Sequence, residues 1–146
     1  MDLHDKRLMA FDWGEKFIGV ATYHVGRDPM VLAHGRLKGG AFPEIWPAIK
    51  TLLDDESVDE LVVGVPFLTD GKAGSTTHKV REFLNDLVKV CPVRVHTQDE
   101  TLSTYMAEER MKSSPRYNFQ VKLSEIDAVS ATIILEDFLR AHGHQL

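Results

Sequence analysis

Residues 60–66 read Glu-Leu-Val-Val-Gly-Val-Pro, a run that is apolar on both faces and rich in β-branched side chains. Such a run is typical of a central parallel strand that other layers of the protein cover on both sides. Parallel neighbours need crossover connections, which are usually helices. The stretch therefore predicts an α/β fold, and the segments on either side of it decide the topology.

The segments before this strand predict an antiparallel arrangement followed by a helix. Short apolar runs are separated by breaks at Trp13–Lys16 and Gly26–Pro29, as expected for hairpins. The expected strands are residues 8–13, 17–25 and 30–37. From Phe42 onward the apolar residues recur at helical spacing, which indicates a helix packed on the sheet.

The segments after it alternate helix and strand. A helix is expected over 76–90, a strand over 93–100, and helices over 103–112 and 124–142, with an irregular 113–123. Crossover helices make the later strands parallel. The sequence thus predicts an α/β fold whose mixed sheet has three antiparallel strands followed by parallel crossover strands, flanked by helices in a single domain over residues 1–146.

Composition limits the class of protein. The 146 residues carry a net charge of −5, so there is no global attraction for phosphate, and any nucleic-acid contact must be local. The single Cys91 excludes an internal disulfide and a four-cysteine zinc site. The longest apolar stretch, 61–68, is too short to span a membrane, and the N-terminus has no signal-peptide pattern. We expect a cytoplasmic protein without membrane contact.

Three acids fall at positions that the predicted topology brings together. Asp12 ends the first strand on the face of Leu8 and Ala10, and Glu100 ends the last strand. If these strands are parallel, the two carboxylates emerge at the same sheet edge, where α/β proteins place their sites. Asp127 lies on the otherwise apolar face of the last helix, so it is expected to point inward.

Converging carboxylates without cysteine or a histidine cluster are hard oxygen ligands, which suit Mg²⁺ or Mn²⁺. Such a site supports phosphoryl transfer, because the ions activate a water and stabilise both oxygens of an in-line displacement. Simpler explanations exist for each acid. Asp12 is also a turn-forming residue, Glu100 an exposed strand end, and Asp127 the acid of a capping box that begins at Ser124.

Four longer strings carry a family resemblance. They are 11–21 (Phe-Asp-Trp-Gly-Glu-Lys-Phe-Ile-Gly-Val-Ala), 62–66 (Val-Val-Gly-Val-Pro) with Asp70-Gly71, 99–104 (Asp-Glu-Thr-Leu-Ser-Thr) and 126–135 (Ile-Asp-Ala-Val-Ser-Ala-Thr-Ile-Ile-Leu). Together, and in this order, they resemble the YqgF family of pre-16S rRNA nucleases, which are also described as Holliday-junction-resolvase-like. Each string alone is a weak signal, but as a set they are specific.

The resemblance implies an RNase H-like fold and nuclease action on the 5′ end of precursor 16S rRNA. It also implies that Asp12, Glu100 and Asp127 are catalytic residues holding Mg²⁺ or Mn²⁺. Thr101 departs from the family, which usually has an arginine after the glutamate, so a fixed cation is missing there. Ser130 stands where resolvases tend to carry a second helix acid.

Basic residues near the crevice are candidates for substrate binding. They are Lys16, Lys72, Arg110 and Arg116. A local basic rim would reconcile the acidic chain with a phosphate substrate, although any one of these residues could simply be solubilising. The expected partner is RNA, as precursor rRNA or within a ribosomal particle. Branched DNA and a non-catalytic RNA-binding or ribosome-binding role remain the alternatives, and both a monomer and a homodimer are compatible with the sequence.

Overall fold

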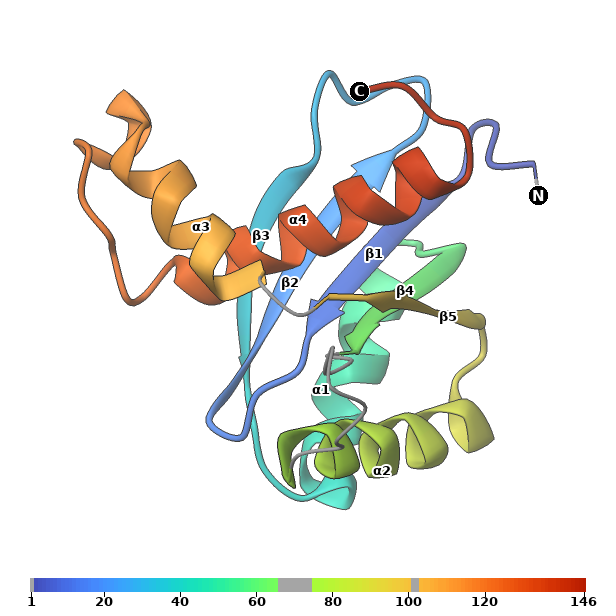
Figure 1. Ribbon diagram of the computed structural model, residues 1–146. Coiled ribbons are helices and arrows are strands. Elements are labelled where there is room, and N and C mark those ends of the chain that lie inside the picture. The colour runs from blue at the N-terminus through green and yellow to red at the C-terminus, as the bar shows by residue number, and fades with distance from the viewer. Residues whose placement is uncertain (1, 66–74, 101–102) are drawn as a thin grey trace.

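The computed structural model describes residues 2–65, 75–100 and 103–146. It contains one five-stranded sheet with helices on both faces (Figure 1). The strands are β1 (Arg7–Asp12), β2 (Phe17–His24), β3 (Leu32–Lys38), β4 (Glu60–Val65) and β5 (Arg94–Asp99). The helices are α1 (Phe42–Asp55), α2 (Ser75–Val90), α3 (Ser103–Lys112), the 3₁₀ helix η1 (Pro115–Tyr117) and α4 (Ile126–Ala141).

The strand order is β3-β2-β1-β4-β5. β1, β2 and β3 pair antiparallel, whereas β1, β4 and β5 run parallel, with β4 between the other two. Every residue of β4 is buried, as its two apolar faces predict. The predicted fold class is therefore confirmed, and the parallel direction of β1 and β5 brings their carboxyl ends to one edge of the sheet.

The two faces of the sheet have separate cores. Helices α1 and α2 cover one face, where Phe11, Val63 and Leu87 are buried in one cluster. Helix α4 crosses the other face and buries Ala131, Ile134 and Phe138 there, while α3 packs on α4 away from the sheet (Figure 1). Leu8 and Ala10 of β1 belong to the α4 core, so the alternation that put Asp12 on their face also puts it on the α4 side.

Two glycines allow α4 to approach the sheet closely. A Cβ added to Gly19 of β2 would lie 1.8 Å from the backbone oxygen of Asp127. A Cβ added to Gly64 of β4 would lie 2.4 Å from Cδ1 of Ile134. The helix backbone therefore rests directly on β2, at the end where Asp127 stands.

The expected element boundaries need small corrections. α4 begins at Ile126 rather than at Ser124, and its N-cap is Glu125, which makes no side-chain capping hydrogen bond. The capping-box explanation of Asp127 is therefore wrong. β1 spans Arg7–Asp12 rather than residues 8–13, so it ends at Asp12, as the position predicted for this acid required.

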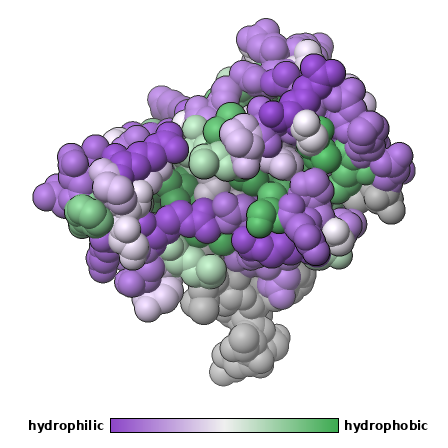
Figure 2. All heavy atoms as spheres, turned by 90° about the horizontal axis from the view of Figure 1, so that it is seen from above, coloured by the Kyte–Doolittle hydropathy of each residue, from purple (hydrophilic) through white to green (hydrophobic). Residues whose placement is uncertain are grey.

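The face seen from above is mainly hydrophilic, with small hydrophobic areas between polar side chains (Figure 2). Large exposed apolar side chains do occur in the described part, including Tyr105, Phe119 and Leu123. Within that part, no helix is long and apolar enough to cross a membrane.

Candidate active site

Asp12 is the last residue of β1 and is half-buried against the first turns of α4. Its pKa is raised to about 7, mainly by burial and also by the nearby charge of Asp127, while a hydrogen bond from the Ser130 hydroxyl opposes the rise. Desolvation and a second acid thus both disfavour the ionised form of the Asp12 carboxyl group. Ser130, at the position where the sequence lacks a second helix acid, holds Asp12 instead.

Asp127 lies in the first turn of α4, directly above Gly19. The helix dipole favours a carboxylate at this end. Arg36 of β3 is on its other side, with Nη1 3.7 Å from Oδ2 of Asp127. Asp127 is therefore located between an acid on β1 and a cation on β3.

Glu100 directly follows β5, where its backbone N–H donates to the carbonyl of Val65 at 2.9 Å. The residue is only 9% exposed, and its Oε1 is buried without a hydrogen-bond partner among the described residues. The pKa of Glu100 is raised to about 8, mainly by burial, then by a hydrogen bond to the Asp137 carboxyl and by the charges of Asp137, Asp99 and Asp12. A buried acid that faces other acids requires an external positive charge or a proton.

Asp137 is a residue of this site that the sequence analysis did not identify. It shares one stripe of α4 with Asp127, Ser130 and Ile134, at the helical spacings 3, 4 and 3. That stripe was a detectable signal, but only the crossing of α4 over the sheet brings its far end to Glu100. The acids therefore form two pairs along α4, Asp127 with Asp12 and Asp137 with Glu100.

The three predicted acids are brought to one edge but are not gathered as a ready-made cluster. Among the described residues, no group of three or more histidine, cysteine, aspartate or glutamate side chains is close enough to hold a metal ion. Asp12 interacts with Asp127, Glu100 interacts with Asp137, and a weaker repulsion links Asp12 to Glu100. The oxygen donors and the unpartnered Oε1 of Glu100 fit a hard divalent cation, which would offset this repulsion.

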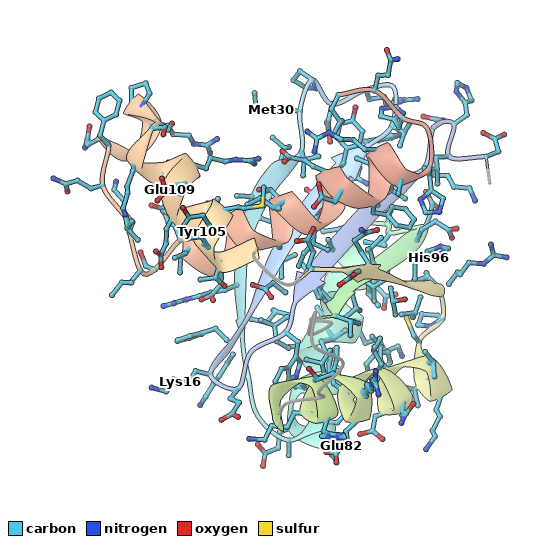
Figure 3. The ribbon with its side chains drawn as sticks, in the orientation of Figure 1. Lys16, Met30, Glu82, His96, Tyr105 and Glu109 are labelled. Atoms are coloured by element: carbon cyan, nitrogen blue, oxygen red, sulfur yellow. The ribbon has the colours of Figure 1, made fainter. Side chains whose placement is uncertain are left out.

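The predicted basic residues lie in different places. Lys16 is exposed at the tip of the β1–β2 hairpin (Figure 3). It therefore lies at the same end of β1 as Asp12. Lys72 lies outside the described residues, as does Thr101. Arg110 forms a paired contact with Glu136 at 2.7 and 3.0 Å, and it lines a cavity of about 330 Å³ together with Arg116 and Met30. Arg110 and Arg116 therefore lie on the α3 side rather than beside the acids.

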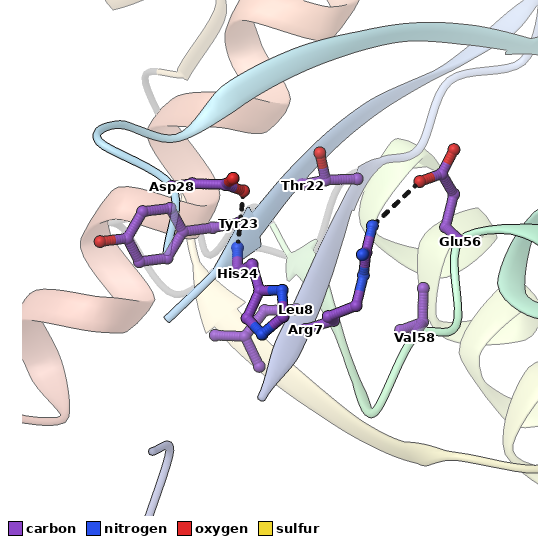
Figure 4. A pocket seen from close by; sticks show the side chains of 8 residues that line it. All are labelled: Arg7, Leu8, Thr22, Tyr23, His24, Asp28, Glu56 and Val58. Atoms are coloured by element: carbon purple, nitrogen blue, oxygen red, sulfur yellow. Dashed lines mark hydrogen bonds and ion pairs between the residues drawn. The ribbon is translucent and has the colours of Figure 1, made fainter. Parts of the chain in front are cut away.

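A second, smaller hollow lies at the opposite end of β1, between Arg7 and His24 (Figure 4). Its volume of about 10 Å³ is roughly the space of one water. Arg7 is paired there with Glu56 at 3.3 Å, and the backbone of His24 donates to Asp28. The polar groups that line this hollow are already paired by an ion pair and a hydrogen bond, so the acid edge is the better candidate for chemistry.

The fold and the acid edge together define the class of RNase H-like resolvase folds. The chain is similar to Thermus thermophilus RuvC solved in complex with a Holliday junction substrate, with a TM-score of 0.60, 13% identity and coverage of 93% of this chain and 96% of that one. It is also similar to the Fowlpox virus resolvase solved with Holliday junction DNA, with a TM-score of 0.55, 12% identity and coverage of 93% and 98%. At these identities the likeness concerns the fold.

Sequence comparison then identifies the family. Residues 6–141 match the RuvX family, which is described as Holliday junction resolvase, and the chain belongs to this family. Two relatives carry the name "Putative pre-16S rRNA nuclease". The one from Shewanella oneidensis is 35% identical over 96% of this chain and 98% of its own length. The one from Roseiflexus sp. is 34% identical over 91% and 93%.

Proposed function

We propose that this protein is a nuclease that hydrolyses phosphodiester bonds with the help of Mg²⁺ or Mn²⁺. The observation that carries the proposal is the buried carboxyl group of Glu100, whose Oε1 has no hydrogen-bond partner among the described residues, at the sheet edge that also ends with Asp12 and faces Asp127. Acids are left to repel one another in a structure mainly where a cation or a reaction uses them.

Asp12, Glu100 and Asp127 are the residues that would hold the cation. When bound, a divalent cation at such a site polarises the scissile phosphate and favours attack by water. Ser130 donates a hydrogen bond to Asp12, which fixes the orientation of this carboxylate and favours its ionised form. Gly19 keeps the first turn of α4 against the sheet, so Asp127 stays beside Asp12.

For the substrate, we propose the 5′ end of precursor 16S rRNA, free or in a ribosomal particle, and action in the bacterial cytoplasm. The names of the relatives with full-length matches support this choice. Branched DNA is the second candidate, favoured by the description of the RuvX family and by the resolvase fold.

The test compares Asp12→Asn with wild type for Mg²⁺-dependent cleavage of precursor 16S rRNA and of a synthetic four-way DNA junction. The folded variant is expected to lose cleavage, because it keeps the shape of Asp12 but not its charge. Asp54→Asn, an exposed change on α1, is the matched control and should cleave like wild type. Retained cleavage by Asp12→Asn would refute the assignment, and the preferred substrate decides between RNA and DNA.

A non-catalytic RNA-binding role predicts a different result. In that case Mn²⁺ titration followed by calorimetry would show no binding that depends on the three acids. We expect binding to wild type and its loss in Asp12→Asn and Asp127→Asn, since each variant removes a charged oxygen donor.

A further inference from the structure

Arg36 on β3 occupies the same row of the sheet as Asp12. Gly19 of β2 is the register partner of Asp12 on one side and of Arg36 on the other. Side chains of one row point to the same face, and on this face the first turn of α4 covers Gly19. Asp12 and Arg36 therefore flank Asp127 from opposite sides.

A β-bulge gives Arg36 this position. The register between β2 and β3 shifts after Val20. Gly35 has a backbone φ of +117°, a value that residues other than glycine rarely adopt. Ala33 pairs with Ala21 of the α4 core, so strict alternation from Ala33 would turn Arg36 to the opposite face. The bulge thus aims the guanidinium at the acid edge.

The contacts of Arg36 orient it without consuming its donors. Its Cζ lies 3.6 Å from the ring centroid of Phe17, which is a cation–π stack. Its distance of 3.7 Å to Asp127 is beyond a hydrogen bond, and it is the longest of the arginine ion pairs in the described part of the chain. Both side chains of the pair are about one-third exposed.

These contacts account poorly for a purely stabilising role. A partly exposed ion pair without a direct hydrogen bond contributes little to folding. By contrast, a planar guanidinium that is stacked on a ring presents its N–H groups edge-on, which suits the oxygens of a phosphate. Among the described residues, the other charged groups of the site, Asp12, Glu100, Asp127 and Asp137, are carboxylates, which repel phosphate.

We propose that Arg36 binds a phosphate oxygen of the nucleic-acid backbone beside Asp127 and thereby positions the strand at the acid edge. This inference rests on the proposed nuclease function, because it requires a nucleic acid at that edge. It adds a substrate-binding residue on β3 to Lys16, Lys72, Arg110 and Arg116, which the sequence suggests for this role.

The experiment measures nucleic-acid binding rather than cleavage. Wild type, Arg36→Ala, Arg36→Gln and Arg36→Lys are titrated in EDTA with a fluorescein-labelled single-stranded RNA and a labelled four-way DNA junction at several salt concentrations. Arg27→Ala is the control, since Arg27 is an exposed arginine paired with Asp5 at the other end of the sheet. Thermal melts identify the folded variants, and the Gln and Lys variants keep the test decisive if Arg36→Ala does not fold.

We expect Arg36→Ala and Arg36→Gln to raise Kd by about 10-fold and to lower the slope of log K against log salt by about 0.7 to 0.9. Arg36→Lys should keep most of the slope, because it keeps the charge. An unchanged Kd and slope would overturn the inference. So would an unchanged Kd together with altered Mn²⁺ binding, measured separately by calorimetry without EDTA, because Arg36 would then act only on Asp127.

The two proposals fail separately. If Asp12→Asn loses cleavage while Arg36→Ala binds like wild type, the nuclease stands and the phosphate contact is wrong. If Asp12→Asn still cleaves, the nuclease assignment is wrong whatever the binding data show.

Discussion

Two buried glutamates at opposite ends of the parallel strands have opposite electrostatic surroundings. At the amino end of β4, Glu60 is 6% exposed and faces two basic groups, with Lys6 at 3.8 Å and His96 at 3.3 Å. At the carboxyl end of β5, Glu100 is equally buried but faces Asp137, and one of its oxygens has no described partner. Basic groups of the chain therefore face Glu60, whereas acids face Glu100.

This difference separates structural from functional charge. A buried carboxylate with its own cation stabilises the fold or is at least neutral, while one without a cation costs free energy. Among the described residues, the carboxyl end of the parallel strands, where α4 crosses them, therefore carries an unbalanced negative charge. The following changes would sharpen or remove that contrast.

The largest effect is expected for Gly19→Ala. The added Cβ would meet the backbone of Asp127, which cannot move without displacing α4. We expect a loss of about 3 kcal/mol in the free energy of unfolding, measured with urea, together with loss of cleavage. Gly64→Ala is the matched control. Its Cβ meets the flexible end of Ile134, so its cost should be smaller, and equal costs would contradict the close approach at Gly19.

The stability of wild type should fall by several kcal/mol as pH rises from about 5 to about 8, because each of two groups loses about 1.4 kcal/mol per pH unit below its folded pKa. The folded pKa values of Asp12 and Glu100, about 7 and about 8, lie above those of the unfolded chain, so the folded state retains protons that the unfolded state has lost. Urea unfolding across this range measures the slope. The slope should be shallower in Asp12→Asn, and Mg²⁺ should restore stability most at high pH. If the unfolding free energy of Asp12→Asn falls with pH as steeply as that of wild type, Asp12 does not have the raised pKa.

Opposite signs are expected for the two buried glutamates at pH 8. Glu60→Gln removes the partner of Lys6 and should lower the free energy of unfolding by about 1 to 2 kcal/mol. Glu100→Gln removes an uncompensated charge and should raise it by about 1 to 2 kcal/mol. Both are measured by chemical unfolding without divalent cations. Two losses of equal size would remove the contrast between the ends.

The smallest effect is expected for Asp137→Asn. The pKa of Glu100 should fall, because a hydrogen-bonding acid and its charge are removed from beside it. Carboxyl resonances followed by NMR against pH measure this shift. Stability should change by less than about 1 kcal/mol, since the pair of Asp137 with Arg140 is exposed and local. An unchanged pKa would mean that Asp137 does not belong to the site.

Much of this arrangement could be predicted from local pattern. The apolar run of β4 identified the parallel strands, and alternation along β1 placed Asp12 on the face that α4 covers. Parallel strands must end at the same edge, so the proximity of Asp12 and Glu100 followed from topology. Helical spacing placed Asp127 on the inward face of α4, although it did not reveal that Glu125 is the N-cap.

Other residues could not be found in this way because their positions depend on distant contacts. Asp137 reaches Glu100 only through the direction in which α4 crosses the sheet. Arg36 reaches Asp127 only because a bulge reverses the alternation of β3. Arg110, which the sequence suggested for the rim of the crevice, lies on the α3 side, where it pairs with Glu136.

By itself, the sequence determined that helices cover both faces of the sheet, which strands are parallel, and at which edge of the sheet the three acids lie. These features follow from periodicity and from the geometry of crossover connections. Only the tertiary structure decided which charges are compensated. That depends on side chains far apart in the chain, whose separation is set by the packing of α4 on Gly19 and Gly64 and by the register of β3. Electrostatic energy falls off with distance and with solvent exposure, and neither can be read from a pattern of residues.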